Sequence, residues 1–444
     1  MGNIITAKFG GSSLADAEQF EKVKAIVEAN SDRRYIIPSA PGKRHPKDYK
    51  ITDLLYICTS HLVNGIPFDD VYKIISERYI KIVHDLSQNH SQMKSLNIEN
   101  YLKEIKLEIE GGASEEYAAS RGEYLNGLIL SNLLNYEFVD ASEIICFDSD
   151  GSFDSKSTSE KIYKRLLNCP KAVIPGFYGS DIDGQIKTFS RGGSDITGAI
   201  IASEVKSSLY ENWTDVSGFL MADPNIVKSP NPIETITYRE LRELSYMGAT
   251  VLHEDSVFPV RDANIPINIK NTNFPKDPGT YIVNDTSPIK RSGSITGIAG
   301  RKNFTVIAIE KTLLNVEVGF NRKLLSILEM NGVSFENMPS GIDSVSLVIE
   351  DKQIKNKLNG IVDEIKRQCT PDSIDVHPNM SLIATVGRGM SSTKGIAGRI
   401  FTALGKKNVN IKMINQGSSE INIIVGVETK EFETAIKAIY DEFV

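Results

Sequence analysis

The sequence predicts an α/β protein in which a large domain with a mostly parallel sheet precedes two smaller βαββαβ units. From residue 3 to about 285, short apolar runs ending in glycine alternate with segments of helical periodicity. This alternation indicates a three-layer α/β/α domain. From about residue 304 to 444 the elements are shorter and their order repeats. A chain of 444 residues is also long for a single core, so we expect more than one domain.

Composition excludes several classes of protein. The hydrophobic content of 41% and charged content of 24% are ordinary for a globular chain. A net charge of -7 without a long Lys/Arg run argues against a nucleic-acid binder. No basic N-terminus precedes an apolar core and no run of about 18 apolar residues occurs, so we expect a cytoplasmic protein without a membrane partner. Four scattered cysteines without a C-x-x-C pair predict neither a zinc site nor disulfides: Cys58, Cys146, Cys169 and Cys369.

The first chemical motif follows the apolar run Asn3–Ala7. It is Lys8-Phe9-Gly10-Gly11-Ser12-Ser13, a lysine at a strand end, two glycines and then helix signals up to about Asn30, with Ser12 or Ser13 as N-cap. Paired glycines let the backbone approach a ligand, and helix N–H groups with a nearby lysine suit an anion. The spacing matches neither the P-loop nor the Rossmann fingerprint. The alternative is a solvent-facing lysine before an ordinary turn.

A second strand, Tyr35–Ala40, is broken by Pro41-Gly42 and followed by the basic loop Lys43–Lys47. Ligands bind at this end of strands in open α/β sheets, so the loop is either a solvated turn or a site for an acidic or phosphorylated ligand. The region from Thr52 to about Asn135 has helical periodicity. It contains Glu123, which by itself is read as a surface carboxylate.

Ser190-Arg191-Gly192-Gly193-Ser194-Asp195 repeats the arrangement of strand, glycine pair and helix start. Asp195 could simply favour the helix dipole and pair with Arg191, but that does not explain two Gly-Gly turns, each beside one cation. A polar cluster, Asn212–Gly218, follows the next strand, and Ala222-Asp223-Pro224 comes soon after. Such turns suit ribose and base recognition, although they are common in loops. Lys276–Thr280 forms one more polar turn.

The turn-rich segment 286–303 is predicted to be a linker between the large first domain, 1–285, and a second region, 304–444. The first βαββαβ unit spans about 313–378, with Leu313–Val318 as its opening strand. The second spans about 381–444 and lacks a closing strand. We therefore infer that Phe304–Glu310 completes the second unit, so that the two ferredoxin-like units interlock.

With these stretches collected, the chain resembles the aspartate kinase (aspartokinase) family of the amino-acid kinase superfamily over essentially its whole length. The matching motifs occur in order: KFGGSS at 8–13, SAPG at 39–42, RGE at 121–123, RGGSD at 191–195, WTDVSG at 213–218 and ADP at 222–224. Two interlocked ACT regulatory units also fit the family. The long basic segment after SAPG is most similar to single-function, ACT-regulated enzymes of Gram-positive bacteria.

The resemblance implies ATP- and Mg²⁺-dependent phosphorylation of the side-chain carboxylate of L-aspartate to 4-phospho-L-aspartate, the committed step toward lysine, methionine and threonine. It implies Lys8 and Asp195 as catalytic residues, and no metal site built from protein ligands alone. The substrate-binding residues implied are Ser39, Thr52, Glu123, Arg191 and Ser194. The residues implied for ATP are Lys8, Gly10, Gly11, Thr214, Asp215, Gly218, Asp223, Pro224, Lys276 and Asp277. Asn225 and Thr250 depart from the arginine and lysine that relatives often carry, so those two contacts to ATP stay open.

For the ACT units, the resemblance implies an amino-acid effector, with lysine favoured, alone or together with threonine, and a homodimer or dimer of dimers. The implied effector residues are Gly319, Phe320, Asn321, Phe335 and Glu336. An exposed strand residue is the alternative for Glu336, and Met413–Ser418 is the matching corner of the second unit. Two other functions stay open: a catalytically silent ACT-type amino-acid sensor, and a kinase of another acyl acceptor.

Overall fold

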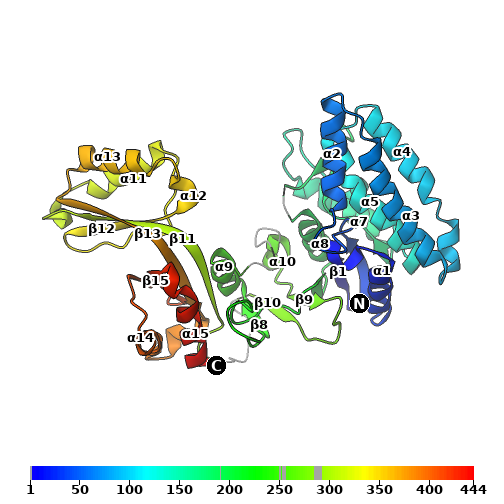
Figure 1. Ribbon diagram of the computed structural model, residues 1–444. Helices are drawn as coiled ribbons and strands as arrows, with labels where there is room; N and C mark the ends of the chain where they lie inside the picture. Colours follow the sequence, from blue (N-terminus) through cyan, green and yellow to red (C-terminus); the bar gives the residue numbers. More distant parts are fainter. Residues whose placement is uncertain (1–2, 191, 250–251, 253–256, 285–292) are drawn as a thin grey trace. The chain divides into compact units, whose positions relative to one another are not determined.

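The structure, a computed structural model, describes residues 3–190, 192–249, 252, 257–284 and 293–444. The chain forms two compact units, whose elements are labelled in Figure 1. The first consists of Met1–Phe219, Glu234–Tyr238 and Val251–Ser287, and the second of Leu220–Ile233, Arg239–Thr250 and Pro288–Val444.

An eight-stranded sheet forms the middle of the first unit, in the order β3-β4-β2-β1-β7-β9-β10-β8. Every pair is parallel except β9 with β10, so the predicted, mostly parallel sheet is confirmed. The strands are β1 (Ile5–Phe9), β2 (Arg33–Pro38), β3 (Glu137–Phe138), β4 (Ala172–Val173), β7 (Leu209–Thr214), β8 (Thr235–Thr237), β9 (Ile267–Asn271) and β10 (Thr280–Val283). A separate hairpin joins β5 (Tyr178–Ser180) and β6 (Ile186–Thr188).

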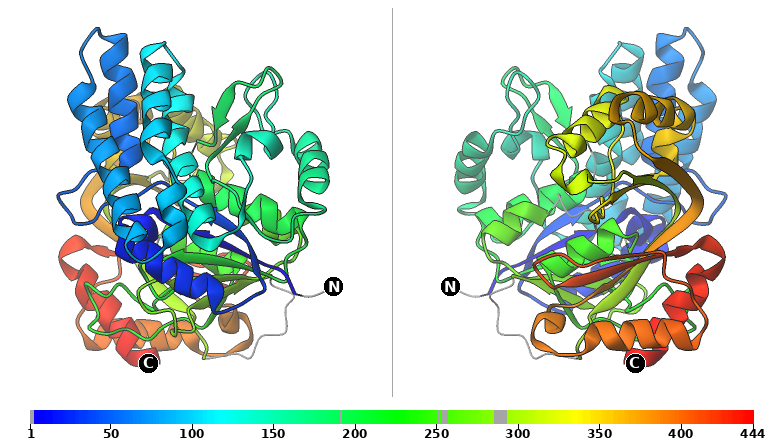
Figure 2. Two further views of the ribbon diagram at one scale, coloured as in Figure 1. Left: turned by 90° about the vertical axis from the view of Figure 1, so that its right-hand side faces the viewer. Right: turned by 90° about the vertical axis from the view of Figure 1, so that its left-hand side faces the viewer.

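Helices cover both faces of this sheet, because successive strand side chains point to opposite sides. In β2, Ile36 packs in a core with α1 to α5, whereas Tyr35 and Ile37 pack in a second core with α6 to α8. Figure 2 shows α2, α3 and α4 running side by side. The helices are α1 (Ala17–Glu28), α2 (Ile51–Val63), α3 (Asp69–Ser87), α4 (Ile98–Glu110), α5 (Glu115–Leu134), α6 (Ala141–Ile144), α7 (Ser155–Leu166), α8 (Gly193–Glu204) and α10 (Phe258–Asp262), with 3-10 turns at Gly11–Leu14 and Ser91–Ser95.

The start of α1 differs from the prediction. The N-cap is Asp16, whose side chain accepts a hydrogen bond from the Gln19 amide, and neither Ser12 nor Ser13 has this role. Ser13 is buried within the 3-10 turn, and its hydroxyl is 2.7 Å from that of Thr272. The glycine motif is therefore followed by a tight turn before the helix begins.

The second unit contains a five-stranded antiparallel sheet in the order β12-β11-β13-β15-β14. Its two longest strands, β11 (Gly297–Glu310) and β13 (Ser373–Val386), pair along most of their length. The remaining strands are β12 (Ser344–Glu350), β14 (Met413–Asn415) and β15 (Asn422–Glu428), and the helices are α9 (Tyr238–Tyr246), α11 (Phe320–Met330), α12 (Asp351–Ile354), α13 (Leu358–Cys369), α14 (Ile396–Lys406) and α15 (Phe432–Phe443).

The assignment of the shared strand was wrong. Residues 304–310 pair with β12 and therefore belong to the first βαββαβ unit. Residues 297–301 pair with 382–386 and complete the second βαββαβ unit. Leu313–Val318 is not a strand, because Leu313 has a φ of 62° and a 3-10 turn follows it. The two small units do interlock, through two continuous strands, because both β11 and β13 run through both of them.

The predicted linker 286–303 ends earlier than expected, because β11 begins at Gly297. Two of its glycines, Gly297 and Gly300, lie in β11, where close packing and not a turn requires them. A Cβ at Gly297 would lie 3.0 Å from Leu244 Cδ1, and one at Gly300 would lie 2.6 Å from the Phe432 ring. Residues 285–292 lie outside the described part of the chain.

Two stretches assigned to the catalytic domain by sequence, 220–233 and 239–250, cluster with the second unit. Within that unit, the Tyr440 hydroxyl accepts a hydrogen bond from the Asn231 amide, and Glu240 accepts one from the Thr296 hydroxyl. Among the described residues, none of the helices has the length and apolar character needed to cross a membrane.

Candidate active site

Lys8 lies near the carboxyl end of β1, beside Asn212 of the neighbouring strand β7. Its Nζ is 2.6 Å from Oδ1 of Asp195, which stands in the first turn of α8. Asn212 Nδ2 donates to the same carboxylate oxygen at 2.8 Å. A buried cation is thus fixed at the strand ends, where open α/β sheets bind ligands.

The glycines after Lys8 lie against two neighbouring backbones. The Gly10 amide donates to the Trp213 carbonyl at 2.9 Å, and the Gly42 amide donates to the Gly11 carbonyl at 2.8 Å. A Cβ at Gly11 would lie 2.8 Å from the Ala40 carbonyl oxygen. Only glycine fits this approach, so the two loops that end β1 and β2 form one surface.

Glu123 is a buried carboxylate on α5 beside this surface. The Ala40 amide bonds to it, and a Cβ at the adjacent Gly122 would lie 2.7 Å from Ala40 Cβ. Glu123 Oε2 is buried without a hydrogen-bond partner among the described residues. Burial raises the pKa of this carboxyl to about 8, against the opposing effects of Arg121 and Lys8. Such an unsatisfied acid in a ligand-binding region is suited to a cationic ligand group.

The structure places three more predicted substrate residues near these elements, whereas Arg191 lies outside the described residues. Ser39 directly follows β2, and its amide donates to the Phe9 carbonyl at 3.0 Å. Thr52 is half-buried in the first turn of α2. Ser194 is buried in the first turn of α8. Ser39 and Ser194 therefore flank the strand ends that carry Lys8.

Apart from Lys8, Gly10 and Gly11 at the end of β1, four of the seven predicted nucleotide residues lie in a second polar group of the first unit: Thr214, Asp215, Gly218 and Asp277. The Thr214 hydroxyl donates to Asp215 at 3.1 Å, and the Ser217 hydroxyl donates to Asp277 at 2.6 Å. Asn271 Nδ2 donates to the Asp215 carbonyl and to Ser217 Oγ, which joins the two turns. Gly218 has a φ of 94°, as the turn requires.

The other predicted nucleotide residues are exposed or belong to the second unit. Lys276 is exposed beside Asp277. Asp223 and Pro224 are exposed in the segment Leu220–Ile233 of the second unit. Asn225, which replaces the usual arginine, donates both its amide and its side chain to Asp223 Oδ1. Thr250 lies outside the described residues.

Comparison with known proteins identifies the family. The amino acid kinase family matches residues 3–271, and an ACT domain matches residues 383–443. Aspartokinase 3 of Bacillus subtilis (strain 168) is 35% identical over 450 residues, which cover 98% of both chains. This chain belongs to the aspartokinase family.

Solved structures support the same assignment of the enzyme. Aspartate kinase of Clostridium acetobutylicum, described as an allosteric enzyme, shares 64% sequence identity with a TM-score of 0.92 over 99% of each chain. E. coli aspartokinase III in complex with lysine and aspartate has a TM-score of 0.75 at 24% identity over 99% of each chain, which shows a shared fold.

Sequence reasoning gave no role to two asparagines of the enzyme's site. Asn212 was noted only as part of a polar cluster, although its register beside Lys8 follows once β1 and β7 are known to be neighbours. Asn126 lies three residues after Glu123 on α5, and its Nδ2 donates to the Ser39 carbonyl at 2.7 Å. The i,i+3 spacing from Glu123 was the available signal.

The predicted effector residues of the enzyme form two groups around α11. Gly319, with a φ of 85°, starts the helix, and Asn321 Oδ1 is buried without a partner among the described residues. Phe320 packs into the core beneath. Phe335 and Glu336 follow the other end of the helix.

Glu336 already has partners within the second unit. It accepts a short hydrogen bond from the Tyr246 hydroxyl and lies 3.8 Å from Arg301, which also pairs with Glu350 at 2.8 Å. The next residue, Asn337, accepts a hydrogen bond from Asn415 at 2.6 Å. The structure thus joins the effector corner of the first ACT unit to α9 and to the matching corner of the second.

Proposed function

We propose that this enzyme transfers the γ-phosphoryl group of ATP to the side-chain carboxylate of L-aspartate, giving 4-phospho-L-aspartate, the committed step toward lysine, methionine and threonine. The observation that carries the proposal is the buried Lys8–Asp195–Asn212 group beside the two glycine loops. The relatives of this chain named above are aspartokinases. Glu123 adds an acidic position for the ammonium group of an amino-acid acceptor.

The chemistry requires charge neutralisation more than proton transfer. A side-chain carboxylate is already ionised near pH 7, so the nucleophile needs no general base. The barrier comes from bringing two anions together and from charge on the transferred phosphoryl group. Lys8 stabilises that charge, aided by the backbone N–H of Gly11, since the N–H of Gly10 donates to the Trp213 carbonyl. Asp195 and Asn212 hold the lysine in place.

Mg²⁺ fits this site as an ion bound together with ATP, and not as an ion held by protein ligands alone. The described residues contain no cluster of three or more Asp, Glu, His or Cys side chains that could hold a metal. Mg²⁺ commonly binds through substrate phosphates plus one or two carboxylates. Asp195, which contacts Lys8 at 2.6 Å, is the carboxylate proposed for this role. When bound, the ion neutralises phosphate charge.

The acceptor binds between the β2 loop and α5. The Glu123 carboxylate accepts hydrogen bonds from the substrate ammonium, and the guanidinium of Arg191 pairs with its α-carboxylate, for which a two-pronged donor is suited. Ser39, Thr52 and Ser194 position the substrate by hydroxyl contacts. Together these residues select an amino acid of defined length.

ATP occupies the polar turns that follow β7 and β9. Thr214, Asp215 and Gly218 contact the ribose and base, with Asp277 joined to them through Ser217. Lys276 supplies an exposed cation beside Asp277. Asp223 and Pro224 belong to the second unit, and their contact with the nucleotide stays a prediction.

The experiment is a coupled assay of ADP release with ATP, Mg²⁺ and L-aspartate, with L-glutamate as the control acceptor. The proposal predicts turnover that requires aspartate. Equal turnover with glutamate would favour a kinase of another acyl acceptor. No turnover with any acceptor, together with tight amino-acid binding, would favour the catalytically silent sensor.

Regulation acts through the ACT units. Lysine, alone or together with threonine, binds at the corner formed by Gly319, Phe320 and Asn321 with Phe335 and Glu336. Inhibition requires that the effector bind two states of the enzyme unequally. The link from Glu336 to Tyr246 of α9 is a route by which binding reaches residues outside the ACT units.

Replacing Glu336 with glutamine is expected to raise the lysine concentration for half-inhibition about tenfold or more, because a hydrogen bond to a charged group contributes about 1.5–3 kcal/mol. The activity without lysine should stay unchanged. Lysine titrations of wild type and Glu336→Gln give the measurement, with Glu329→Gln on the exposed face of α11 as the control. Equal inhibition of all three proteins would contradict the effector role of Glu336.

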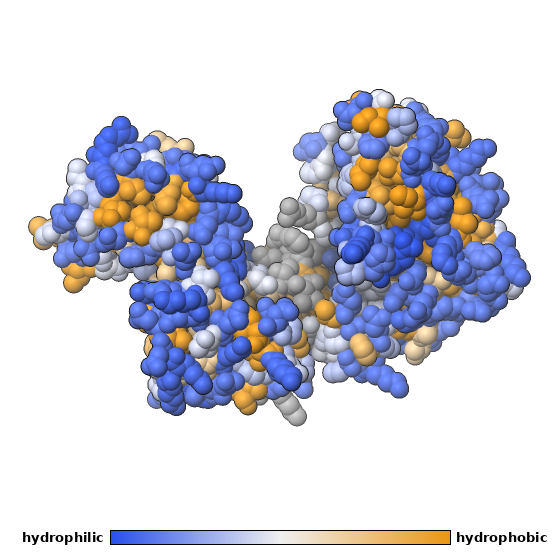
Figure 3. Space-filling model, viewed as in Figure 1, coloured by the Kyte–Doolittle hydropathy of each residue, from blue (hydrophilic) through white to orange (hydrophobic). Residues whose placement is uncertain are grey.

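The enzyme is proposed to form a homodimer or a dimer of dimers through its ACT units. Around the start of α11 the large apolar side chains Leu313, Val316, Val318 and Ile342 are 64 to 97% exposed. The Asn315 amide donates to the Ile342 carbonyl, so the two loops are adjacent. Figure 3 shows hydrophobic residues gathered on the face of the second unit that is in view. Light scattering would give a multiple of the 49.0 kDa chain mass.

The proposed location is the cytoplasm, where ATP and free amino acids are available. All four cysteines are buried free thiols.

A further inference from the structure

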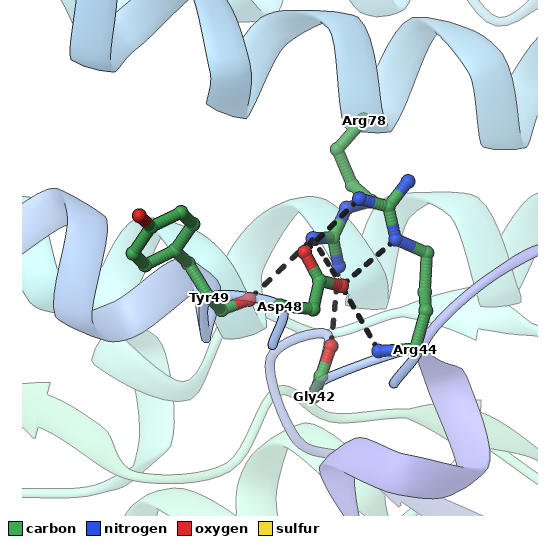
Figure 4. Close-up of polar contacts among 5 residues, drawn as sticks. All are labelled: Gly42, Arg44, Asp48, Tyr49 and Arg78. Carbon is green, nitrogen blue, oxygen red and sulfur yellow. Dashed lines mark hydrogen bonds and ion pairs between the residues drawn. The ribbon is translucent and has the colours of Figure 1, made fainter. Parts of the chain in front are cut away.

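Directly after the exposed basic loop Lys43–Lys47, the segment that follows β2 buries an acidic side chain, Asp48. Asp48 and Arg78 form a buried ion pair, with side chains only 6% and 2% exposed. Arg78 Nη2 lies 2.9 Å from Asp48 Oδ1 and 2.8 Å from Oδ2. Figure 4 shows Arg44 bonded to the same carboxylate from the loop itself, through Nε at 2.8 Å. The Arg44 hydrogen bond holds the pKa of Asp48 well below its usual range. This part of the loop is therefore an ordered structure, which neither the solvated-turn nor the ligand-site interpretation anticipated.

Arg78 also holds the backbone at both ends of the loop. Its Nη1 donates to the Gly42 carbonyl at 3.1 Å, and its Nη2 approaches the Tyr49 carbonyl at 3.4 Å. The amide of the same Gly42 bonds to Gly11, and a Cβ at Gly42 would lie 2.6 Å from the Gly11 carbonyl carbon. One guanidinium thus fixes the residue through which the two glycine loops touch.

The next residue of α3 holds the opposite wall of the acceptor site. The Tyr79 hydroxyl donates to the Gly122 carbonyl at 2.8 Å, directly before Glu123. Two consecutive side chains of α3 therefore hold the loop that follows Ser39 and the helix that carries Glu123. Arg78 Nε stays buried without a partner among the described residues, which costs stability.

We propose that Arg78 is a positioning residue for acceptor binding: paired with Asp48, it holds the segment from Ser39 to Thr52 against the glycine loop. Arg78 contacts no substrate in this account. The inference rests on the proposed aspartate kinase activity. The Arg78–Asp48 pair determines the positions of Ser39 and Thr52 and therefore the affinity for aspartate. Lys8 and Asp195 determine the rate of phosphoryl transfer.

The test compares Arg78→Lys and Asp48→Asn with wild type. A lysine keeps the charge but cannot donate to Asp48 and Gly42 in the same fixed fork. We expect the KM for aspartate to rise about tenfold in Arg78→Lys, with kcat changed less than about threefold, because the lost contact affects binding before the chemical step. Asp48→Asn should change KM in the same direction. Arg44→Ala, which removes the half-exposed partner but keeps the buried pair, is the matched control and should change KM by less than about twofold.

A purely structural role would give a different pattern. In that case the thermal midpoints fall, but the KM for aspartate of the folded variants stays within about twofold of wild type, and this result would overturn the proposal. If Arg78→Lys does not fold, Asp48→Asn is judged by the same criterion. If wild type shows no aspartate-dependent turnover, the proposed function fails. In that case, the affinity for aspartate is measured by calorimetry for wild type and Asp48→Asn. Equal affinities of the two proteins would overturn the positioning role of Arg78 and Asp48.

Discussion

Replacing Lys8 with alanine is expected to lower kcat by about 10²–10³-fold, the loss typical of removing one preorganised group that stabilises transition-state charge. Lys8 is buried, 2.6 Å from Asp195, and lies at the carboxyl end of a central strand. Because its positive charge faces the proposed phosphate position, its removal leaves the developing charge on the phosphoryl group without its main protein partner. The KM for aspartate should change much less than kcat.

The measurement is the rate of ADP release at saturating ATP and aspartate. Lys73→Ala, which removes an exposed lysine of α3, is the control and should keep wild-type activity. Trp213 is the sole tryptophan of the chain, and its carbonyl binds the Gly10 amide, so its fluorescence can report nucleotide binding independently of turnover. A folded Lys8→Ala enzyme with nearly wild-type kcat would contradict the proposed role.

Replacing Glu123 with glutamine is expected to raise the KM for aspartate by about 10- to 100-fold, since a charged hydrogen-bond partner for the ammonium contributes about 1.5–3 kcal/mol. The change keeps the size of the side chain. The kcat at saturating aspartate should fall less, because Glu123 does not contact the transferred phosphoryl group in this account.

Glu123 also gives the wild type a pH dependence. Its carboxyl has a pKa of about 8 in the folded protein against an ordinary value of 4.5. Below pH 8 the group is mostly protonated, so the binding of an ammonium requires loss of that proton. The KM for aspartate of wild type should therefore fall as pH rises from 6.5 to 8.5, by about tenfold per pH unit well below the pKa. The same profile in Glu123→Gln should be flat.

The raised pKa of Glu123 also predicts how the stability of the ligand-free enzyme changes with pH. A carboxyl whose pKa is raised on folding stabilises the folded state fully below the unfolded pKa, and this stabilisation is lost as pH rises through the folded value. The thermal midpoint of wild type relative to Glu123→Gln should thus decrease between about pH 4.5 and 8. A constant difference across that range would show that Glu123 has an ordinary pKa.

Much of the fold could be predicted because buried parallel strands are near-continuous apolar runs and glycine pairs mark where they end. Lys8 and Asp195 were each found from such a local pattern, and the structure brings them together. The shared ACT strand was misassigned because Gly297 and Gly300 resemble turn residues. Glycine is required at these two positions because Leu244 and Phe432 pack closely against them, and no local sequence pattern shows this packing.

The supporting residues of the site were harder to predict. Asn212 lies on β7, beside Lys8 on the neighbouring strand β1, and these two residues are about two hundred positions apart in the sequence. Arg78 and Asp48 are 30 residues apart, and both types of residue are normally exposed. Only tertiary packing shows that they are buried together. Glu336, which resembled an exposed strand residue, is held by Tyr246 from a segment that sequence analysis assigned to the other domain.

The most direct test of the account identifies which carboxylate is phosphorylated. The reaction with ATP, Mg²⁺ and L-aspartate is treated with borohydride, which reduces an acyl phosphate to the alcohol, and the products are separated by chromatography. Phosphorylation of the side-chain carboxylate predicts homoserine, formed by wild type and lost in Lys8→Ala. ADP release without homoserine, or with the alcohol derived from the α-carboxylate, would contradict the account.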